Sequence, residues 1–144
     1  MRKTLLLIIL ISTTVMFYAC NKSSDEDNPV SLYSVDINSL NNQKILNVIN
    51  DENLDDGVYQ IITNSNNYIF FKGIENKYTN IRLMLEDKTL IISCYREPSS
   101  ENNDKLYVIR EKNTTSPNDK SIFFDTIILN INDKEVPFNS VQII

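Results

Sequence analysis

The sequence has no histidine and no tryptophan, and it has two cysteines and two glycines. Histidine is the commonest general base and the commonest metal ligand among side chains. Its absence excludes the Ser-His-Asp and Cys-His arrangements that many hydrolases use. The sequence also has no glycine-rich phosphate-binding loop. These absences argue against an enzyme, and we expect no catalytic residue, no metal site and no bound cofactor.

The N-terminal segment has the three parts of an export signal. Two basic residues stand near its start, an unbroken apolar run covers residues 5–11, and the small residue Ala19 precedes Cys20. Secretory signals combine a positive start, an apolar core of about 7–15 residues and a small residue at the cleavage point. A permanent membrane span would need roughly 20 apolar residues, and polar residues 12–14 interrupt the run. We expect residues 1–19 to be a signal peptide, and a permanent span is the weaker alternative.

The residues Phe17-Tyr18-Ala19-Cys20 resemble the lipobox of bacterial lipoproteins. In that family the signal peptide is cut before the cysteine, whose thiol carries a diacylglyceryl group and whose amine is usually acylated. The family most often has Leu where Phe17 stands, so the match rests on Ala19 and Cys20. Two or more acyl chains anchor a protein stably to a membrane. The resemblance therefore implies lipidation of Cys20 and attachment to the outer membrane or the cell surface.

Residues 20–29 form a predicted tether between this anchor and the rest of the chain. The segment is polar and charged beyond Cys20 and has no large apolar side chain, so it cannot bury enough surface to fold. Lys22 followed by the acidic residues 25–27 is similar to a signal found in some surface-exposed lipoproteins of Gram-negative bacteria. A plain solvated linker is an equal alternative, because acidic runs are common in linkers.

Acidic residues outnumber basic ones, and the net charge of the whole chain is −5. Removal of residues 1–19 changes this charge to −7, because Arg2 and Lys3 are the charged residues that leave. Nucleic acids and anionic lipid headgroups bind basic surfaces. We therefore expect no nucleic-acid partner, and a membrane contact that depends on the lipid at Cys20. Residues 30–144 have room for a single domain.

Cys94 is the one cysteine besides Cys20, so no disulfide within the domain is expected to stabilise it. It alternates with Leu90 and Ile92, which places all three side chains on one face of a strand. Free cysteine is among the most buried residue types. We therefore predict that Cys94 is a core thiol rather than a reactive one.

Short apolar runs alternate with turn residues from Gly57 onward, at the spacing of an all-β domain. Asparagine tolerates the left-handed backbone that glycine usually supplies, so a chain with two glycines can still turn often, as in the asparagine-rich turn at residues 64–67. The most secure hairpin joins residues 80–86 and 89–95. Further strands are predicted at residues 31–36, 58–63, 68–72, 106–110, 121–131 and 135–144.

Two of these predicted strands have special features. The run 121–131 is apolar nearly throughout, as in a strand that is covered on both faces. The segment 135–144 contains Pro137 and therefore belongs at an edge or a bulge. Leu40, Ile45 and Ile49 share a helical spacing, which predicts one short helix near the start of the domain. The fold class that follows is a mainly β, single, small antiparallel sandwich or barrel-like domain.

The acidic segment 51–57 matches a calcium-binding EF-hand loop at its first, third and fifth positions. The turn glycine, Gly57, is one place late, and Ile62 stands where the loop needs its final glutamate. We therefore predict a solvated acidic loop before a strand. The tyrosines and phenylalanines of the strands could stack on a sugar or anchor a protein, but packing within the domain is the favoured role.

Three functions are compatible with these features. The favoured one is a surface-anchored, non-enzymatic module that binds a protein or a glycan. The second is an inhibitor or immunity protein that blocks a protease or toxin with one of the polar loops 96–104 and 111–120, because negative charge steers a protein to basic enzymes. The third is a hydrolase that uses two carboxylates, although no pair of acidic residues stands out.

Overall fold

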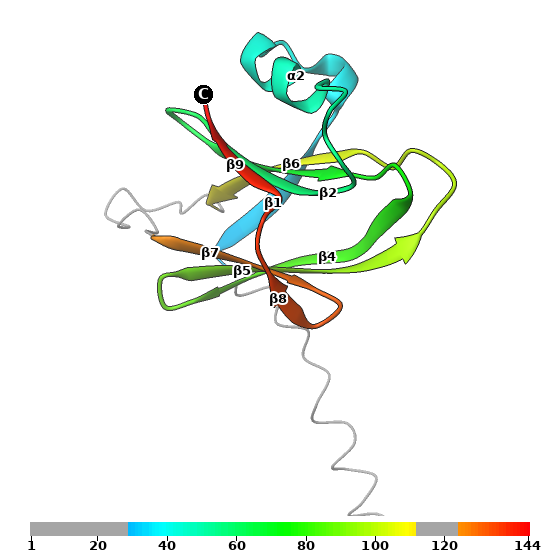
Figure 1. Cartoon of the computed structure of the whole chain (residues 1–144). Helices are drawn as coiled ribbons and strands as arrows, with labels where there is room; N and C mark the ends of the chain where they lie inside the picture. Colours follow the sequence, from blue (N-terminus) through cyan, green and yellow to red (C-terminus); the bar gives the residue numbers. More distant parts are fainter. Residues whose placement is uncertain (1–28, 112–123) are drawn as a thin grey trace, which may run out of the picture.

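The domain is a two-sheet sandwich with a short helix on its outer side, as Figure 1 shows. It is known from a computed structural model that describes residues 29–111 and 124–144. The predicted signal peptide, the lipidation site Cys20 and nearly all of the predicted tether lie outside the described residues. The expectation of a mainly β sandwich is confirmed.

The upper sheet of Figure 1 has five strands in the order β1, β6, β3, β2, β9. Adjacent strands are antiparallel, except that β9 runs parallel to β2. The bounds of the five strands are β1 Val30–Val35, β6 Lys105–Glu111, β3 Asn67–Lys72, β2 Gly57–Ile62 and β9 Ser140–Ile143.

The lower sheet has four strands in the order β4, β5, β7, β8. Here β7 runs parallel to β5, and the other neighbours are antiparallel. The bounds are β4 Asn76–Glu86, β5 Thr89–Pro98, β7 Thr126–Ile131 and β8 Lys134–Val136. Both sheets are therefore mixed rather than wholly antiparallel. The difference arises because β7 and β9 are reached from strands of the opposite sheet, and parallel neighbours need such crossing connections instead of hairpins.

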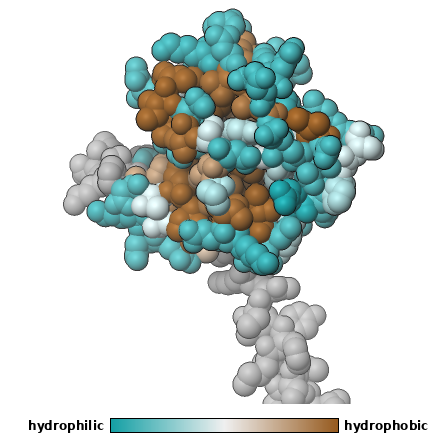
Figure 2. Space-filling model, viewed as in Figure 1, coloured by the Kyte–Doolittle hydropathy of each residue, from teal (hydrophilic) through white to brown (hydrophobic). Residues whose placement is uncertain are grey.

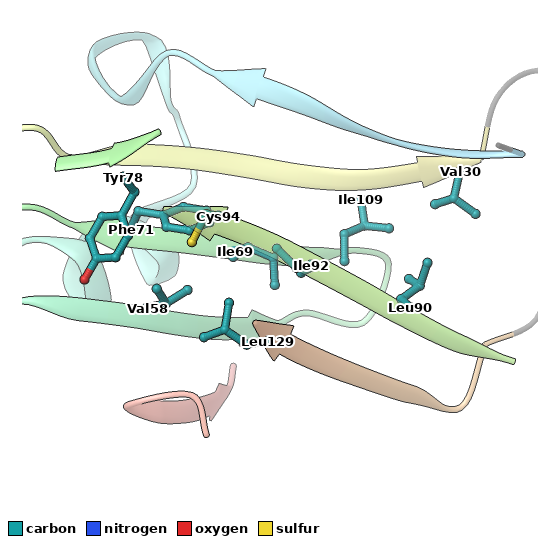
Figure 3. Packing of buried hydrophobic residues seen from close by; sticks show 10 residues of the cluster. All are labelled: Val30, Val58, Ile69, Phe71, Tyr78, Leu90, Ile92, Cys94, Ile109 and Leu129. Carbon is teal, nitrogen blue, oxygen red and sulfur yellow. The ribbon is translucent and has the colours of Figure 1, made fainter. Parts of the chain in front are cut away.

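The main core lies between the sheets, where side chains from both sheets point toward one another (Figure 3). Cys94 is 3% exposed and packs here with Leu90 and Ile92, which confirms the predicted core thiol. Each large apolar side chain that is fully buried stabilises the fold by about 1.5–3 kcal/mol. The buried members of this core are Val30, Val58, Ile69, Phe71, Tyr78, Leu90, Ile92, Cys94, Ile109 and Leu129.

A second cluster fills the space between the upper sheet and the helix α2, Gln43–Ile49. Side chains alternate along a strand, so Tyr59 and Phe70 point away from the main core and pack with Ile45 and Ile49 of the helix. Asn42 caps the helix, because its side chain accepts hydrogen bonds from the first backbone N–H groups. The predicted short helix is confirmed, and a 3₁₀ turn, η1 (Ile37–Ser39), precedes it.

Asparagine takes the left-handed backbone conformation in this fold, as predicted, although not in the turn at residues 64–67, and aspartate takes it as well. The residues with positive φ are Asn80, Asp87, Asn132 and Asp133, and neither of the two glycines has a positive φ. Asp87 lies in the predicted hairpin between β4 and β5. Asn132 and Asp133 both have positive φ in the turn between β7 and β8, which suits a tight hairpin of the right twist.

The predicted strand 121–131 is shorter than expected. Residues 121–123 lie outside the described residues, and β7 begins at Thr126, after Phe124 and Asp125. Leu129 is the one residue of β7 that is buried, so the strand is not covered on both faces. The prediction from this apolar run was wrong because the outer face of the lower sheet lies toward solvent. The predicted single strand 135–144 is wrong: β8 ends at Val136 and β9 begins at Ser140 in the other sheet, with Pro137 in the crossing between them. Pro137 ends β8 because proline has no N–H for a sheet ladder.

Within residues 29–111 and 124–144, no helix has the length and apolar character needed to cross a membrane.

Candidate functional site

A hollow of about 380 Å³ lies at one end of the sandwich. It is found where β5 and β7 finish, next to the turn into β8, which Figure 1 shows at this end of the lower sheet. Gly57, at the start of β2, and the buried Tyr78 of β4 also line it. We call this feature the end hollow. Ligand pockets in proteins have volumes of roughly 300–1,000 Å³, so the end hollow can hold a small molecule.

Two cationic side chains line the end hollow. Arg96 follows the buried Cys94 by two residues and lies directly across from Tyr78 in the β4–β5 ladder, so its side chain extends the inner face of the sheet. Lys134 lies across from Ile131, which packs against the main core. Neither cation forms an ion pair with a carboxylate of the described residues. No aspartate or glutamate is among the described residues that line the hollow.

Two asparagines add hydrogen-bond donors to the same wall. Asn139 donates its backbone N–H to the Val58 carbonyl, and its Oδ1 accepts from the Val58 N–H at 3.0 Å. Asn132 donates its backbone N–H to the Cys94 carbonyl, and its Oδ1 accepts from the Arg96 N–H at 2.9 Å. Each asparagine therefore continues a sheet ladder with one backbone group and one side-chain oxygen.

These bonds fix which way each amide group faces. A backbone N–H is a donor, so the atom that it meets must be the amide oxygen, and the NH₂ group takes the other position. No described residue accepts a hydrogen bond from the NH₂ group of Asn132 or Asn139. The end hollow is thus lined by a guanidinium, an ammonium and two amide donors, and by no side-chain carboxylate.

Gly57 leaves the space that the Asn139 side chain occupies. A Cβ atom at position 57 would overlap the amide group of Asn139. Ile131, Val136 and Pro137 are the apolar part of the lining, which we call the apolar wall. The lining therefore combines polar and apolar side chains.

Asp56 holds the loop behind the end hollow. Its Oδ2 accepts hydrogen bonds from the backbone N–H groups of Ile74, Glu75 and Asn76 at 2.7–3.0 Å, and its Oδ1 accepts one from the Tyr78 hydroxyl at 3.1 Å. Partial burial disfavours the charged carboxylate, but these hydrogen bonds outweigh burial and lower the pKa of Asp56. Asp56 is therefore an ionised structural anchor and not a residue of the solvated loop that the sequence predicted.

The hydroxyl of Tyr78 cannot serve as a base in the hollow. Burial raises its pKa, and the neighbouring Asp56 carboxylate raises it further. The hydroxyl therefore stays protonated and donates to Asp56. Asp133, the acidic residue next to Lys134, accepts a hydrogen bond from Tyr95 on the outer face of the lower sheet. The site can hold a ligand rich in acceptors, because the described residues of its lining present donors and include no aspartate or glutamate.

The acidic segment that the sequence analysis compared with an EF-hand loop does not form a metal site among the described residues. The acidic residues 51–57 do not gather around one point: Asp51 binds Asn53, whereas Asp56 binds the β3–β4 loop. Among the described residues, no group of three or more aspartate, glutamate or cysteine side chains could hold a metal ion.

Most aromatic side chains of the strands pack inside the domain, which is the role that the sequence analysis favoured for them. Tyr59, Phe70, Phe71 and Tyr78 are buried. Tyr95 is exposed on the lower sheet, and Tyr33, also exposed, lies under the Arg110 guanidinium on β1 of the upper sheet. The exposed tyrosines therefore stand on different sheets and form no joint stacking platform.

The two predicted contact loops have different outcomes. Residues 112–120 of the loop 111–120 lie outside the described residues. The loop 96–104 is shorter than predicted, because β5 continues to Pro98. Its remaining part is tied down: Asn103 donates its backbone N–H to the Gly73 carbonyl, and Asp104 accepts from Gly73 N–H and from Lys72.

Sequence reasoning placed Arg96 in a loop and missed the end hollow. One signal was present, because Arg96 continues the alternation of Leu90, Ile92 and Cys94 and so puts a cation at the end of a buried face. Asn132 and Asn139 gave no such signal. Their roles depend on partners 36 and 81 residues away in the chain.

A separate apolar surface lies along the open side of the sandwich. Figure 2 shows hydrophobic surface over the end of β9 and, below it, over the side where β7 and β8 lie. Ile143 is 81% exposed and Val141 is 50% exposed, both on the edge strand β9. Edge strands with exposed apolar side chains favour contact with other chains.

Comparisons with protein-family models, with curated proteins and with solved structures found no match to this chain.

Proposed function

We propose that this protein is a lipid-anchored, non-enzymatic binding module at the outer membrane or cell surface, and that its ligand enters the end hollow. The lipobox-like residues 17–20 support the anchor, and the polar segment 20–29 supports a tether that holds the domain away from the membrane. The ligand-binding part of the proposal rests on the end hollow.

The observation that carries this proposal is that four polar side chains at the end hollow are all hydrogen-bond donors. Arg96, Lys134, Asn132 and Asn139 all present donors, and their positions are set by strands and by a tight hairpin turn. Sites that are already formed lose little conformational entropy on binding. The same lining argues against a hydrolase, because a carboxylate mechanism needs acidic groups at the substrate. A glycan or protein that presents acceptor oxygens fits this hollow.

A binding screen tests the proposal. The full-length chain would be produced in a Gram-negative host, purified in detergent and applied to arrays of neutral glycans, acidic glycans and peptides. We expect a defined subset to be retained, and we expect the double variant Arg96→Ala with Lys134→Ala to lose that retention. The matched control removes two cations elsewhere, Arg82→Ala with Lys44→Ala, and should retain the subset. Retention of no glycan and no peptide would overturn the proposal, as would turnover of a retained glycan.

A further inference from the structure

We infer that the end hollow binds the carboxylate of an acidic sugar residue. The inference rests on the proposed function and names the ligand class of the same site. It follows from three features of the described residues: the charge of the lining, the direction of the amide groups and the apolar wall.

The charged side chains of the lining are positive, whereas the net charge of the whole chain is negative. The chain has a net charge of −5, yet Arg96 and Lys134 meet at the end hollow without a carboxylate among its lining residues. Asp56 and Asp133 adjoin lining residues in the sequence but do not line the hollow: Asp56 binds three backbone N–H groups of the loop between β3 and β4, and Asp133 accepts from Tyr95 on the outer face of the lower sheet. Two cations that line one hollow without an ion pair to a described carboxylate favour an anionic ligand, and hydrogen bonds between charged partners are about twice as strong as neutral ones.

The amide donors select for additional acceptor oxygens. The oxygens of Asn132 and Asn139 are used by the N–H groups of Arg96 and Val58, so both asparagines can offer the ligand their NH₂ groups. Sugar hydroxyls accept such bonds through their oxygen atoms. A ligand that carries both a carboxylate and several hydroxyls therefore matches the lining better than a simple anion does.

The size and the apolar wall favour a ring over a single carboxylate group. A hollow of about 380 Å³ exceeds the volume of an acetate-sized group and lies in the range of small-molecule pockets. Ile131, Val136 and Pro137 form a surface on which the C–H face of a sugar ring can pack. An acidic side chain of a peptide would fill a small part of this space and would leave the wall uncovered.

Calorimetric titration with matched sugars tests this inference. Methyl β-D-glucuronide and methyl β-D-glucoside differ in having a carboxylate or a hydroxymethyl group on the ring. The full-length protein in detergent should bind the glucuronide at least about tenfold more tightly than the glucoside. Arg96→Ala should weaken glucuronide binding about tenfold, whereas Arg82→Ala on the outer face should leave it unchanged. Added salt should weaken the binding, because it screens the two exposed cations.

Two further probes separate the sources of a carboxylate. Acetate and N-acetylglutamate should both bind more weakly than methyl β-D-glucuronide at millimolar concentration. Equal or tighter binding of N-acetylglutamate would overturn the sugar assignment in favour of an acidic peptide, and equal binding of acetate would reduce the site to a simple anion site. If the array screen finds a ligand but the glucuronide does not bind, this inference fails and the proposed function stands. If neither experiment finds a ligand, both fail.

Discussion

At the scale of the residue, Asp56 ties the start of β2 to the loop between β3 and β4. It accepts hydrogen bonds from three backbone N–H groups and from the buried Tyr78 hydroxyl. Replacement by alanine would remove four hydrogen bonds to a charged acceptor, two of them partly buried, and bonds to charged groups contribute more to stability than neutral ones. We expect Asp56→Ala to lower the free energy of unfolding by about 3 kcal/mol, measured by urea denaturation. The neighbouring Asp55→Ala is the control and should change it by less than about 0.5 kcal/mol. Equal losses in both variants would contradict this role.

The lowered pKa of Asp56 also predicts how stability depends on pH. A carboxyl group whose pKa is lower in the folded state stabilises the fold fully above its unfolded value, near 3.8. That stabilisation is lost as the pH falls below this value through the lower pKa of the folded state. We expect Asp56→Asn, which cannot ionise, to have a flatter stability profile below pH 4 than the original protein. Identical slopes in the acid range would show that Asp56 does not titrate as described.

Gly57 leaves room for the side chain of Asn139, which lines the end hollow. The Cβ of Gly57→Ala would overlap the Asn139 amide and displace it from the Val58 N–H. We expect an unfolding free energy lower by about 1 kcal/mol, the typical worth of one hydrogen bond. We also expect weaker binding of methyl β-D-glucuronide, although no charge has changed. Arg82→Ala, on the outer face of β4, lies outside the lining and serves as the comparison for binding. Full glucuronide affinity in Gly57→Ala would mean that Asn139 takes no part.

At the scale of the element, β5 joins a buried face to the end hollow. Leu90, Ile92 and Cys94 face the main core, and Arg96 continues the same face into the end hollow. Burial raises the pKa of the Cys94 thiol to about 11, so the thiol stays protonated at neutral pH. The thiol contributes fully to stability below its unfolded pKa, near 9.0, and this contribution falls as the pH rises toward 11.

Alkylation measures this burial directly. In a Cys20→Ser variant, Cys94 is the single thiol of the chain. We expect iodoacetamide to modify it about a hundredfold more slowly in buffer than in denaturing urea, because reaction requires both exposure and the thiolate. The modification would be followed by mass spectrometry. Rapid alkylation under native conditions at neutral pH would show that β5 does not pack as described.

The strands themselves could be predicted because local patterns determine them. The alternation of Ile81, Leu83 and Leu85, with Asp87 in the turn, predicted the hairpin of β4 and β5. The placement of β7 beside β5 could not be predicted, because two residues that pair in parallel, such as Leu90 and Ile127, carry no shared local signal.

The candidate site was hidden from the sequence for a related reason. Asn132 and Asn139 lie in turn-rich segments where asparagine is ordinary. Only the packing of β2, β5 and the β7–β8 turn at one end brings their amide groups beside Arg96 and Lys134. Asp56 was assigned to a solvated loop because its partners lie 18 to 22 residues further along the chain.

At the scale of the whole molecule, the proposal joins a membrane anchor to a binding domain. If residues 17–20 act as a lipobox, the mature chain begins at Cys20 with acyl chains attached. We expect mass spectrometry of the membrane fraction from a Gram-negative host to find a diacylglyceryl-modified Cys20. The Cys20→Ser variant should lack this mass and should leave the membrane fraction or keep its signal peptide. An intact Met1 or an unmodified Cys20 in the original chain would contradict the anchor.

The central claim is that the end hollow is the ligand-binding site of this domain. A nuclear magnetic resonance titration of the ¹⁵N-labelled Cys20→Ser protein with methyl β-D-glucuronide tests it most directly. The account predicts that the largest shifts occur in the backbone amides of Gly57, Arg96 and Lys134 and in the side-chain NH₂ groups of Asn132 and Asn139. Shifts centred on β9 or on α2, with these five residues unchanged, would contradict it.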